Sequence, residues 1–182
     1  MIWSSLFPNA VLQTWRRTGL TGRLATGLLA IIVFTLVWDA LANMVDARIR
    51  WPLTGLAAAA GWARLGLSIR PMLVLMIVGF AFDSVSGAPF GVFPLVFLST
   101  YAVLASTSLL LGSEMDPVTG SILPFLGMGF GVFVLWVFAS VIASAPINPI
   151  PLLIAWVTSC VFYALFEGLF DLHSFKTSAT SG

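Results

Sequence analysis

The sequence predicts an all-α, polytopic membrane protein, and its composition and its long apolar runs lead to that prediction. Of its 182 residues, 59% are hydrophobic and only 8% are charged, whereas an ordinary soluble domain has about 25% charged residues. The mean hydropathy is +1.05. Long apolar runs recur with short polar breaks between them, and a helix needs roughly 20 residues to cross the hydrocarbon core of a bilayer. The chain therefore has room for about six crossings and for no separate soluble domain.

Three regions follow from this pattern: an N-terminal segment at 1–20, one transmembrane domain at 21–172 and a tail at 173–182. The N-terminal segment mixes Trp and Phe with arginine, which is typical of an interfacial amphipathic helix or of a frayed end. It lacks the pattern of a cleaved signal peptide, and the small polar tail is predicted to be disordered. We expect six helices, at 24–42, 51–65, 71–82, 90–111, 117–143 and 149–170.

Proline and N-cap residues mark where several of these helices begin. Pro52 and Pro71 suit a first helical turn, where the missing N–H is not needed, and Asp116-Pro117 and Asn148-Pro149 each place a capping side chain before a proline. The segment 51–65 is short and rich in alanine. It is the weakest crossing, and a re-entrant segment or one tilted inside the bundle is the alternative.

The basic residues predict the orientation, because arginine and lysine are enriched on the cytoplasmic side of membrane proteins. With the N-terminus inside, six basic residues fall in the cytoplasm and only Arg48 and Arg50 fall outside. The six are Arg16, Arg17, Arg23, Arg64, Arg70 and Lys176. We therefore expect both termini to be cytoplasmic and the break after the third helix to face outward.

That break, residues 82–91, is the most informative stretch of the sequence. An ionised carboxylate is costly in a bilayer, and Asp83 lies at the end of a predicted helix, where the helix dipole is negative. We expect Asp83 to act as a structural cap, bonded to backbone N–H groups of Ser86 and Gly87, to the start of the next helix or to an arginine. A partner or ligand surface and simple solvation are the alternatives.

Candidate catalytic groups are few. The one histidine, His173, lies in the tail, so an intramembrane serine hydrolase has no base to activate its serine. Asp39 and Asp83 both lie towards the outer face in this topology, so a carboxylate pair of the aspartyl-peptidase kind is geometrically possible, but no shared motif surrounds them. The single cysteine, Cys160, lies in an apolar run. We predict that the chain is not an enzyme.

Cofactor and nucleic-acid sites are not indicated either. His, Cys and carboxylate residues do not cluster as metal ligands do. The glycines from Gly127 to Gly131 lie inside an apolar helix and follow no strand, which argues against nucleotide binding. A net charge of +1 is too small for the basic stripe that nucleic acid requires. We therefore expect no cofactor, no metal and no nucleic acid. We expect the lipid bilayer to be a partner of the protein.

Small residues four positions apart predict close helix packing in lipid. Gly127 with Gly131 and Ala57 with Gly61 give two such faces, which pack either within the bundle or against a partner helix. Two ion pairs are also expected, and both are interpreted as structural. Glu167 lies within reach of Arg64 or Arg70, and Asp39 lies on the side of the two outer arginines.

The residues from Arg70 to Gly91 resemble a known family. A proline-led apolar span, a Gly-Phe approach at Gly79 and the pattern D-x-x-S-G-x-x-x-G resemble the rod shape-determining MreD proteins. Four residues fit that pattern letter for letter: Asp83, Ser86, Gly87 and Gly91. The resemblance covers about residues 70–95, with Pro89 inside the turn, whereas the Gly-Phe approach is displaced towards the aspartate.

This resemblance implies a fold similar to the substrate-binding S components of energy-coupling-factor transporters. It implies a non-enzymatic scaffold of the bacterial elongation complex in the inner membrane, which supports cell shape and sidewall peptidoglycan synthesis. The implied partner is an MreC-like single-span protein, which connects to the MreB cytoskeleton and the RodA and penicillin-binding protein synthase. The alternative is a vitamin-binding transporter subunit, whose outward pocket would hold the polar residues Asp83, Ser86, Ser99, Thr100 and Tyr101.

Overall fold

The computed structural model describes residues 19–44, 53–111 and 117–170, and every regular element within these ranges is a helix. The predicted N-terminal segment lies outside the described residues except for its last two positions, and the tail 173–182 lies outside them entirely. The elements are α3 (Leu20–Met44), α4 (Thr54–Trp62), the 3-10 helix η1 (Ala63–Leu65), α5 (Ile69–Ser86), α6 (Val92–Leu111), α7 (Pro117–Ile142) and α8 (Ile150–Phe170).

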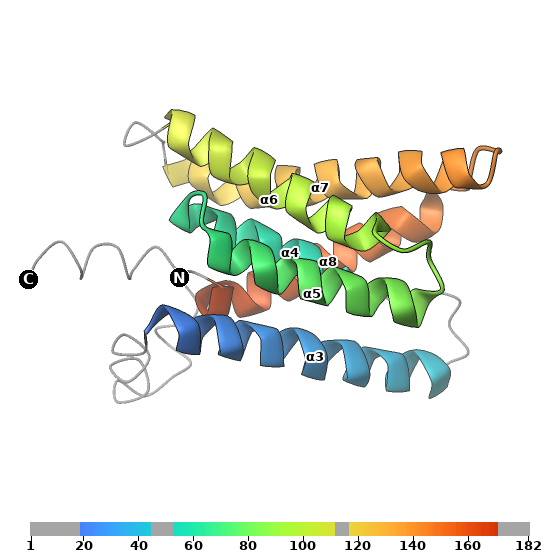
Figure 1. Ribbon diagram of the computed structural model, residues 1–182, viewed down its shortest axis with the longest axis horizontal. Helices are drawn as coiled ribbons and strands as arrows, with labels where there is room; N and C mark the ends of the chain where they lie inside the picture. Colours follow the sequence, from blue (N-terminus) through green and yellow to red (C-terminus); the bar gives the residue numbers. More distant parts are fainter. Residues whose placement is uncertain (1–18, 45–52, 112–116, 171–182) are drawn as a thin grey trace, which may run out of the picture.

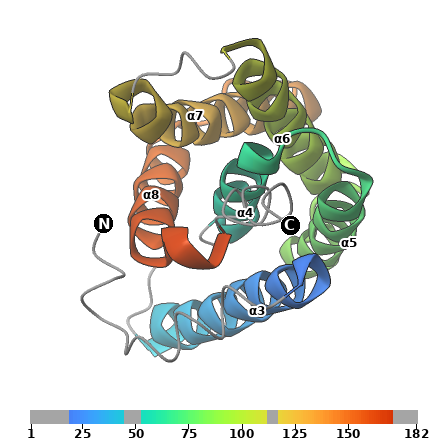
Figure 2. The same ribbon diagram turned by 90° about the vertical axis from the view of Figure 1, so that its left-hand side faces the viewer.

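Long helices form a ring around a short one. Viewed along the bundle, α3, α5, α6, α7 and α8 follow one another around α4, which occupies the centre (Figure 2). The first residue of α3 and the last of α8 lie at the same end of the bundle (Figure 1). We call this end the Arg64 end. The turns from α5 to α6 and from α7 to α8 lie at the opposite end, which we call the Asp83 end.

Within the described residues, the five ring helices are long and apolar enough to cross a membrane. Their outer faces carry large hydrophobic side chains that are exposed among the described residues, including Leu29, Ile77, Leu110, Leu126 and Leu165. A helix that is hydrophobic all round requires an apolar surrounding, and only a helix satisfies its own backbone there. The chain is therefore a multi-pass helical membrane protein.

The central helix α4 differs from the predicted crossing at 51–65. It has nine residues, and all of them are buried. Nine residues extend about 14 Å, which is half of the roughly 30 Å hydrocarbon core. The small side chains of Ala57 to Ala60, each at most 2% exposed, allow the surrounding helices to approach. The hydropathy of this segment thus reflects burial inside the bundle. This agrees with the alternative interpretation of 51–65 as a segment inside the bundle.

Helix α5 continues four residues beyond the predicted end at Phe82. The hydroxyl groups of Ser84 and Ser86 donate to the carbonyl oxygens of Phe80 and Phe82, at 2.9 Å and 2.7 Å. These bonds to the preceding turn let polar side chains remain helical. Gly87, with φ of +69°, then ends the helix in the left-handed conformation that glycine adopts without cost. Asp83 therefore lies in the last turn of a regular helix, and the break begins at Gly87.

Candidate functional site

Asp83 bonds the end of α5 to the start of α6. Its side chain is only 2% exposed. One carboxylate oxygen, Oδ2, accepts a hydrogen bond from the backbone N–H of Gly91 at 2.6 Å. The other, Oδ1, accepts from the backbone N–H of Phe93 at 2.9 Å. Both oxygens are thus occupied by the first turn of the next helix, and of the predicted cap partners it is the start of the following helix that Asp83 binds.

Two further backbone donors at the start of α6 also have acceptors. Val92 N–H donates to the carbonyl oxygen of Pro89 at 3.3 Å, and Leu95 N–H donates to that of Gly91 at 3.1 Å. Pro94 has no N–H to satisfy. The first N–H groups of a helix normally lack intrahelical partners, and here the carboxylate and the turn supply all that are needed.

The position of Asp83 is electrostatically favourable because of α6. At the C-terminal end of α5 alone, a carboxylate would meet the negative end of that helix dipole. Its two bonds to α6 place it at the positive N-terminal end of the second helix. A buried charge is tolerated when hydrogen bonds satisfy it, and charge-assisted bonds to backbone N–H groups are among the stronger ones. The arrangement thus gives both carboxylate oxygens of Asp83 a structural role.

Glycine and serine shape the turn between the two helices. Gly87 and Gly91 have φ values of +69° and +99°, in the region where a Cβ atom is costly. No atom lies within 4 Å of a Cβ built at either glycine, so backbone conformation and not space requires them. The hydroxyl of Ser86 accepts a hydrogen bond from Ala88 N–H at 3.3 Å. All four motif residues therefore act within this one turn.

Gly79 lies where the backbones of α5 and α6 approach each other closely, and the sequence did not show its role. A Cβ added there would lie 2.5 Å from Pro94 Cα and would also collide with Pro94 N. These are backbone atoms that cannot rotate away. The sequence offered one signal for this role, namely a glycine in an apolar helix four positions before an aspartate. Gly79 thus sets the spacing that brings Asp83 within reach of α6.

Aromatic side chains pack this hairpin. The buried rings of Phe82 and Phe93 lie 5.6 Å apart, and both lie within 5.8 Å of the ring of Phe97. Away from this cluster, Phe80 stacks on Phe90 with a centroid distance of 4.5 Å, and Phe90 is 79% exposed. The hairpin therefore has an apolar interior and one protruding aromatic ring beside the turn.

An apolar groove of about 330 Å³ lies next to the turn, between the start of α6 and the end of α7. The turn contributes Ala88 and Pro89, and α7 contributes Leu135, Ala139 and Ile142. Ser86 is the only polar residue in its lining, and its hydroxyl already donates to Phe82. Such a groove offers van der Waals contact and no reactive group.

The predicted packing residues lie inside the bundle, and all four are buried. A Cβ on Gly127 would collide with Leu104, one on Gly131 would lie 2.5 Å from Thr100 Oγ1, and one on Gly61 would collide with Phe170. Ala57 is completely buried in α4. Neighbouring helices of the same chain cover these positions, so a partner helix has no access to them here.

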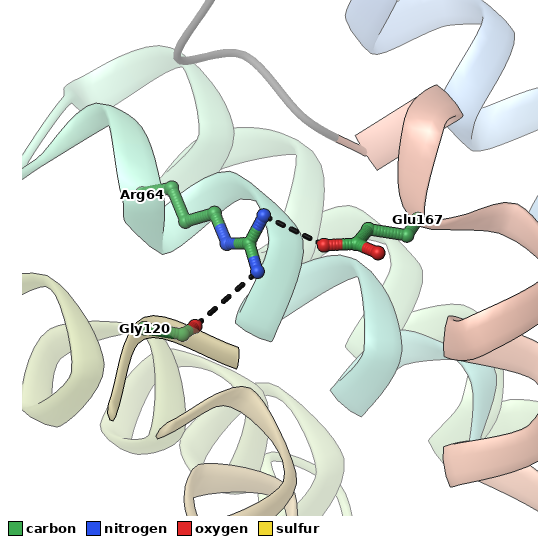
Figure 3. Close-up of polar contacts among 3 residues, drawn as sticks. All are labelled: Arg64, Gly120 and Glu167. Atoms are coloured by element: carbon green, nitrogen blue, oxygen red, sulfur yellow. Dashed lines mark hydrogen bonds and ion pairs between the residues drawn. The ribbon is translucent and has the colours of Figure 1, made fainter. Parts of the chain in front are cut away.

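At the Arg64 end, the predicted pairing of Glu167 is confirmed and assigned to Arg64. Arg64 Nη1 lies 2.8 Å from Glu167 Oε1, and the two side chains are 27% and 46% exposed. Arg64 Nη2 also donates to the carbonyl oxygen of Gly120 at 3.4 Å (Figure 3). The other predicted pair cannot be compared, since Arg48, Arg50 and the side chain of Asp39 lie outside the described residues, as does His173.

The polar residues proposed for a vitamin pocket are already bonded. Tyr101 is completely buried; its hydroxyl donates to Gly66 O at 2.7 Å and accepts from Ser68 N–H at 2.9 Å. Thr100 and Ser99 donate to Val96 O in their own helix at 2.8 Å and 3.0 Å. Tyr101 therefore fixes the link between η1 and α5. The sequence had not indicated that role.

Metal-ligating groups do not gather in the part of the chain that the structure describes: no three His, Cys, Asp or Glu residues lie together there. The geometry is that of a turn held by one buried carboxylate beside an apolar groove. Such an arrangement can position helices and offer apolar contact. No protein-family model, no curated protein and no solved structure matches the chain.

Proposed function

We propose that this protein is a non-enzymatic membrane scaffold of the MreD type. The proposed place of the protein is the elongation complex of the bacterial inner membrane. There it would bind an MreC-like partner and so support cell shape and sidewall peptidoglycan synthesis. The observation that carries the proposal is that both oxygens of Asp83 accept backbone N–H bonds at the start of α6, from Gly91 just before the helix and from Phe93 in its first turn. The four residues that resemble the MreD motif thus fix the conformation of the turn between α5 and α6. A partner can dock against a turn whose conformation is fixed without first having to order it.

The groove beside that turn is the proposed docking surface. Its lining is apolar, and it opens at the Asp83 end between two helices whose outer faces are also apolar. Association of helices in lipid depends mainly on close van der Waals packing and on small residues that allow it. Ala88, Ala139 and Ala143 line the groove, and these small side chains suit the apolar part of a single-span partner.

The arrangement of the chain ends agrees with the proposed orientation. The start of α3 and the end of α8 lie at one end of the bundle (Figure 1), which puts both on the same side of the membrane. The excess of basic residues on that side favours a cytoplasmic location. In this proposal the Asp83 end faces the extracytoplasmic side, and the bundle is similar to the S-component fold.

A vitamin-binding transporter subunit is the rival function, and the hydrogen bonds of Tyr101, Thr100 and Ser86 weigh against it. A small-molecule site needs several convergent polar groups on an apolar wall. Mass spectrometry of the purified protein separates the two functions, because a retained vitamin supports the rival and contradicts the scaffold.

Co-purification with a tagged MreC-like single-span protein from the same genome tests the scaffold directly. Ala139→Phe fills the groove, and Ala164→Phe adds the same ring on the exposed face of α8 as a matched control. We expect the first variant to lose most of the co-purified partner and the rod shape of the complemented cells, and the second to keep both. If Ala139→Phe, Asp83→Ala and Gly87→Leu all leave association and shape intact, the proposed docking surface is wrong.

A further inference from the structure

The hydrogen bond from Arg64 to Gly120 replaces one that α7 cannot make. In an α-helix the N–H of residue 124 bonds to the carbonyl oxygen of residue 120. Residue 124 is a proline inside α7, so this N–H is missing and the Gly120 carbonyl is left without its helical donor. Arg64 Nη2 donates to that same oxygen at 3.4 Å. Within a membrane, side chains of neighbouring helices commonly satisfy backbone groups freed by proline.

One guanidinium thereby connects three elements. Arg64 belongs to η1, directly after the central helix α4, and it contacts α7 through Gly120 and α8 through Glu167 (Figure 3). The planar guanidinium carries several donors in a fixed geometry, which lets a single arginine hold two acceptors at once. A lysine at this position would be a single point charge.

The part of α7 before Pro124 is less buried than the part that follows it. None of the side chains from Val118 to Leu123 is buried, although Leu123 packs partly against the core. After Pro124, which is itself buried, Gly127, Met128 and Gly131 are buried in the helix packing. A segment with few buried apolar contacts has a low local free energy of opening.

We propose that residues 117–123 form an arm of α7 that hinges at Pro124 and that Arg64 latches this arm to the bundle. The inference goes beyond the scaffold function and does not rest on it. With the latch closed, the guanidinium satisfies Gly120 and pairs with Glu167. Both charged side chains are partly exposed. Release of the guanidinium frees the arm to rotate about the proline, where the helix lacks a hydrogen bond. Hinges of this kind absorb rotation at a few residues.

Distance measurement between spin labels by double electron–electron resonance in nanodiscs tests the latch. Cys160 is the one native cysteine, so Cys160→Ala provides the background for labels at Thr119→Cys on the arm and Leu73→Cys on α5. A second pair, Phe133→Cys with Leu73→Cys, reports on α7 beyond the hinge and serves as the control. All four positions are described, and the three labelled ones are exposed.

We expect Arg64→Ala to broaden the distribution of the 119–73 distance and to leave the 133–73 distribution unchanged. Adding Pro124→Ala should reverse the broadening, because the new N–H at residue 124 bonds to Gly120 without the arginine. An unchanged 119–73 distribution in Arg64→Ala overturns the proposal. So does equal broadening of both pairs, which indicates general loosening, and so does a failure of Pro124→Ala to reverse the change.

Discussion

The two ends of the bundle are both held by a charged side chain, but in different ways. At the Asp83 end, a buried carboxylate bonds two backbone N–H groups that lie eight and ten residues further along the same hairpin. At the Arg64 end, a partly exposed guanidinium joins elements that are distant in sequence, with Gly120 lying 56 residues away. The first contact closes a local turn, whereas the second ties three separate parts of the fold.

Their energies should differ accordingly. Hydrogen bonds to charged groups contribute about 1.5–3 kcal/mol each, and leaving their buried partners unsatisfied adds to the loss. Ion pairs that reach solvent contribute about 0–1 kcal/mol. We therefore expect the Asp83 end to behave as a rigid element and the Arg64 end as an adjustable one, and four substitutions test this difference.

Removing the carboxylate should have the largest effect. Asp83→Ala leaves the N–H groups of Gly91 and Phe93 buried without an acceptor, and we expect a loss of about 4 kcal/mol in the free energy of unfolding. Asp83→Asn keeps one acceptor oxygen and should lose roughly half as much. Reversible unfolding by sodium dodecyl sulfate in mixed micelles measures both. Equal stability of the alanine variant and the native protein would show that the carboxylate does not hold the turn.

Gly79→Ala should have the second largest effect. Its new methyl group collides with the backbone of Pro94, and the helices must separate, at a cost of about 2–3 kcal/mol. Gly129→Ala is the matched control in α7, because its methyl group meets the Trp156 ring at an ordinary 3.7 Å. The same unfolding titration applies, and similar losses for the two variants would contradict the close approach of α5 and α6.

Gly87→Ala should cost about 1–2 kcal/mol, because an alanine at φ of +69° is strained. The space around this glycine is open, so no collision contributes. Gly87→Asn tests the cause, since asparagine enters the left-handed region more readily than alanine and should recover part of the loss. A thermal unfolding series of both variants in the same detergent measures this, and identical melting temperatures would indicate that backbone strain is not involved.

Arg64→Ala should have the smallest effect on global stability, about 1 kcal/mol. The pair with Glu167 is partly exposed and its loss opens only one end of the bundle. Glu167→Gln should cost less still, because Arg64 keeps its bond to Gly120. Unfolding titrations of the two variants rank them, and a loss for Arg64→Ala as large as that for Asp83→Ala would remove the contrast between the two ends.

Local signals in the sequence predicted what local contacts determine. Asp116-Pro117 and Asn148-Pro149 gave the starts of α7 and α8 to within one residue, and the cap role of Asp83 followed from its place beside a helix end. The ion pair of Glu167 was also predicted, because an apolar bundle contains few basic side chains with which a glutamate can pair. Each of these inferences needed only the sequence around one residue or the count of charges.

Three-dimensional packing determined what the sequence did not show. The burial of α4 depends on five other helices, so its hydropathy alone resembled a crossing. The role of Gly79 depends on Pro94 in a different helix, and the role of Pro124 depends on an arginine 60 residues earlier in the chain. The predicted end of α5 at Phe82 is too early, because the predicted break at 82–91 includes Ser84 and Ser86, whose hydroxyl bonds to the preceding turn continue the helix.

Hydrogen–deuterium exchange of individual backbone amides in nanodiscs tests the contrast between the two ends most directly. The account predicts slow exchange at Gly91 and Phe93 in the native protein, fast exchange there in Asp83→Ala, and faster exchange at residues 121–123 of the arm than at Gly91 and Phe93. Arg64→Ala should accelerate the arm alone. Two results would contradict the account: slower exchange in the arm than at Gly91 and Phe93, or exchange rates at Gly91 and Phe93 that do not change in Asp83→Ala.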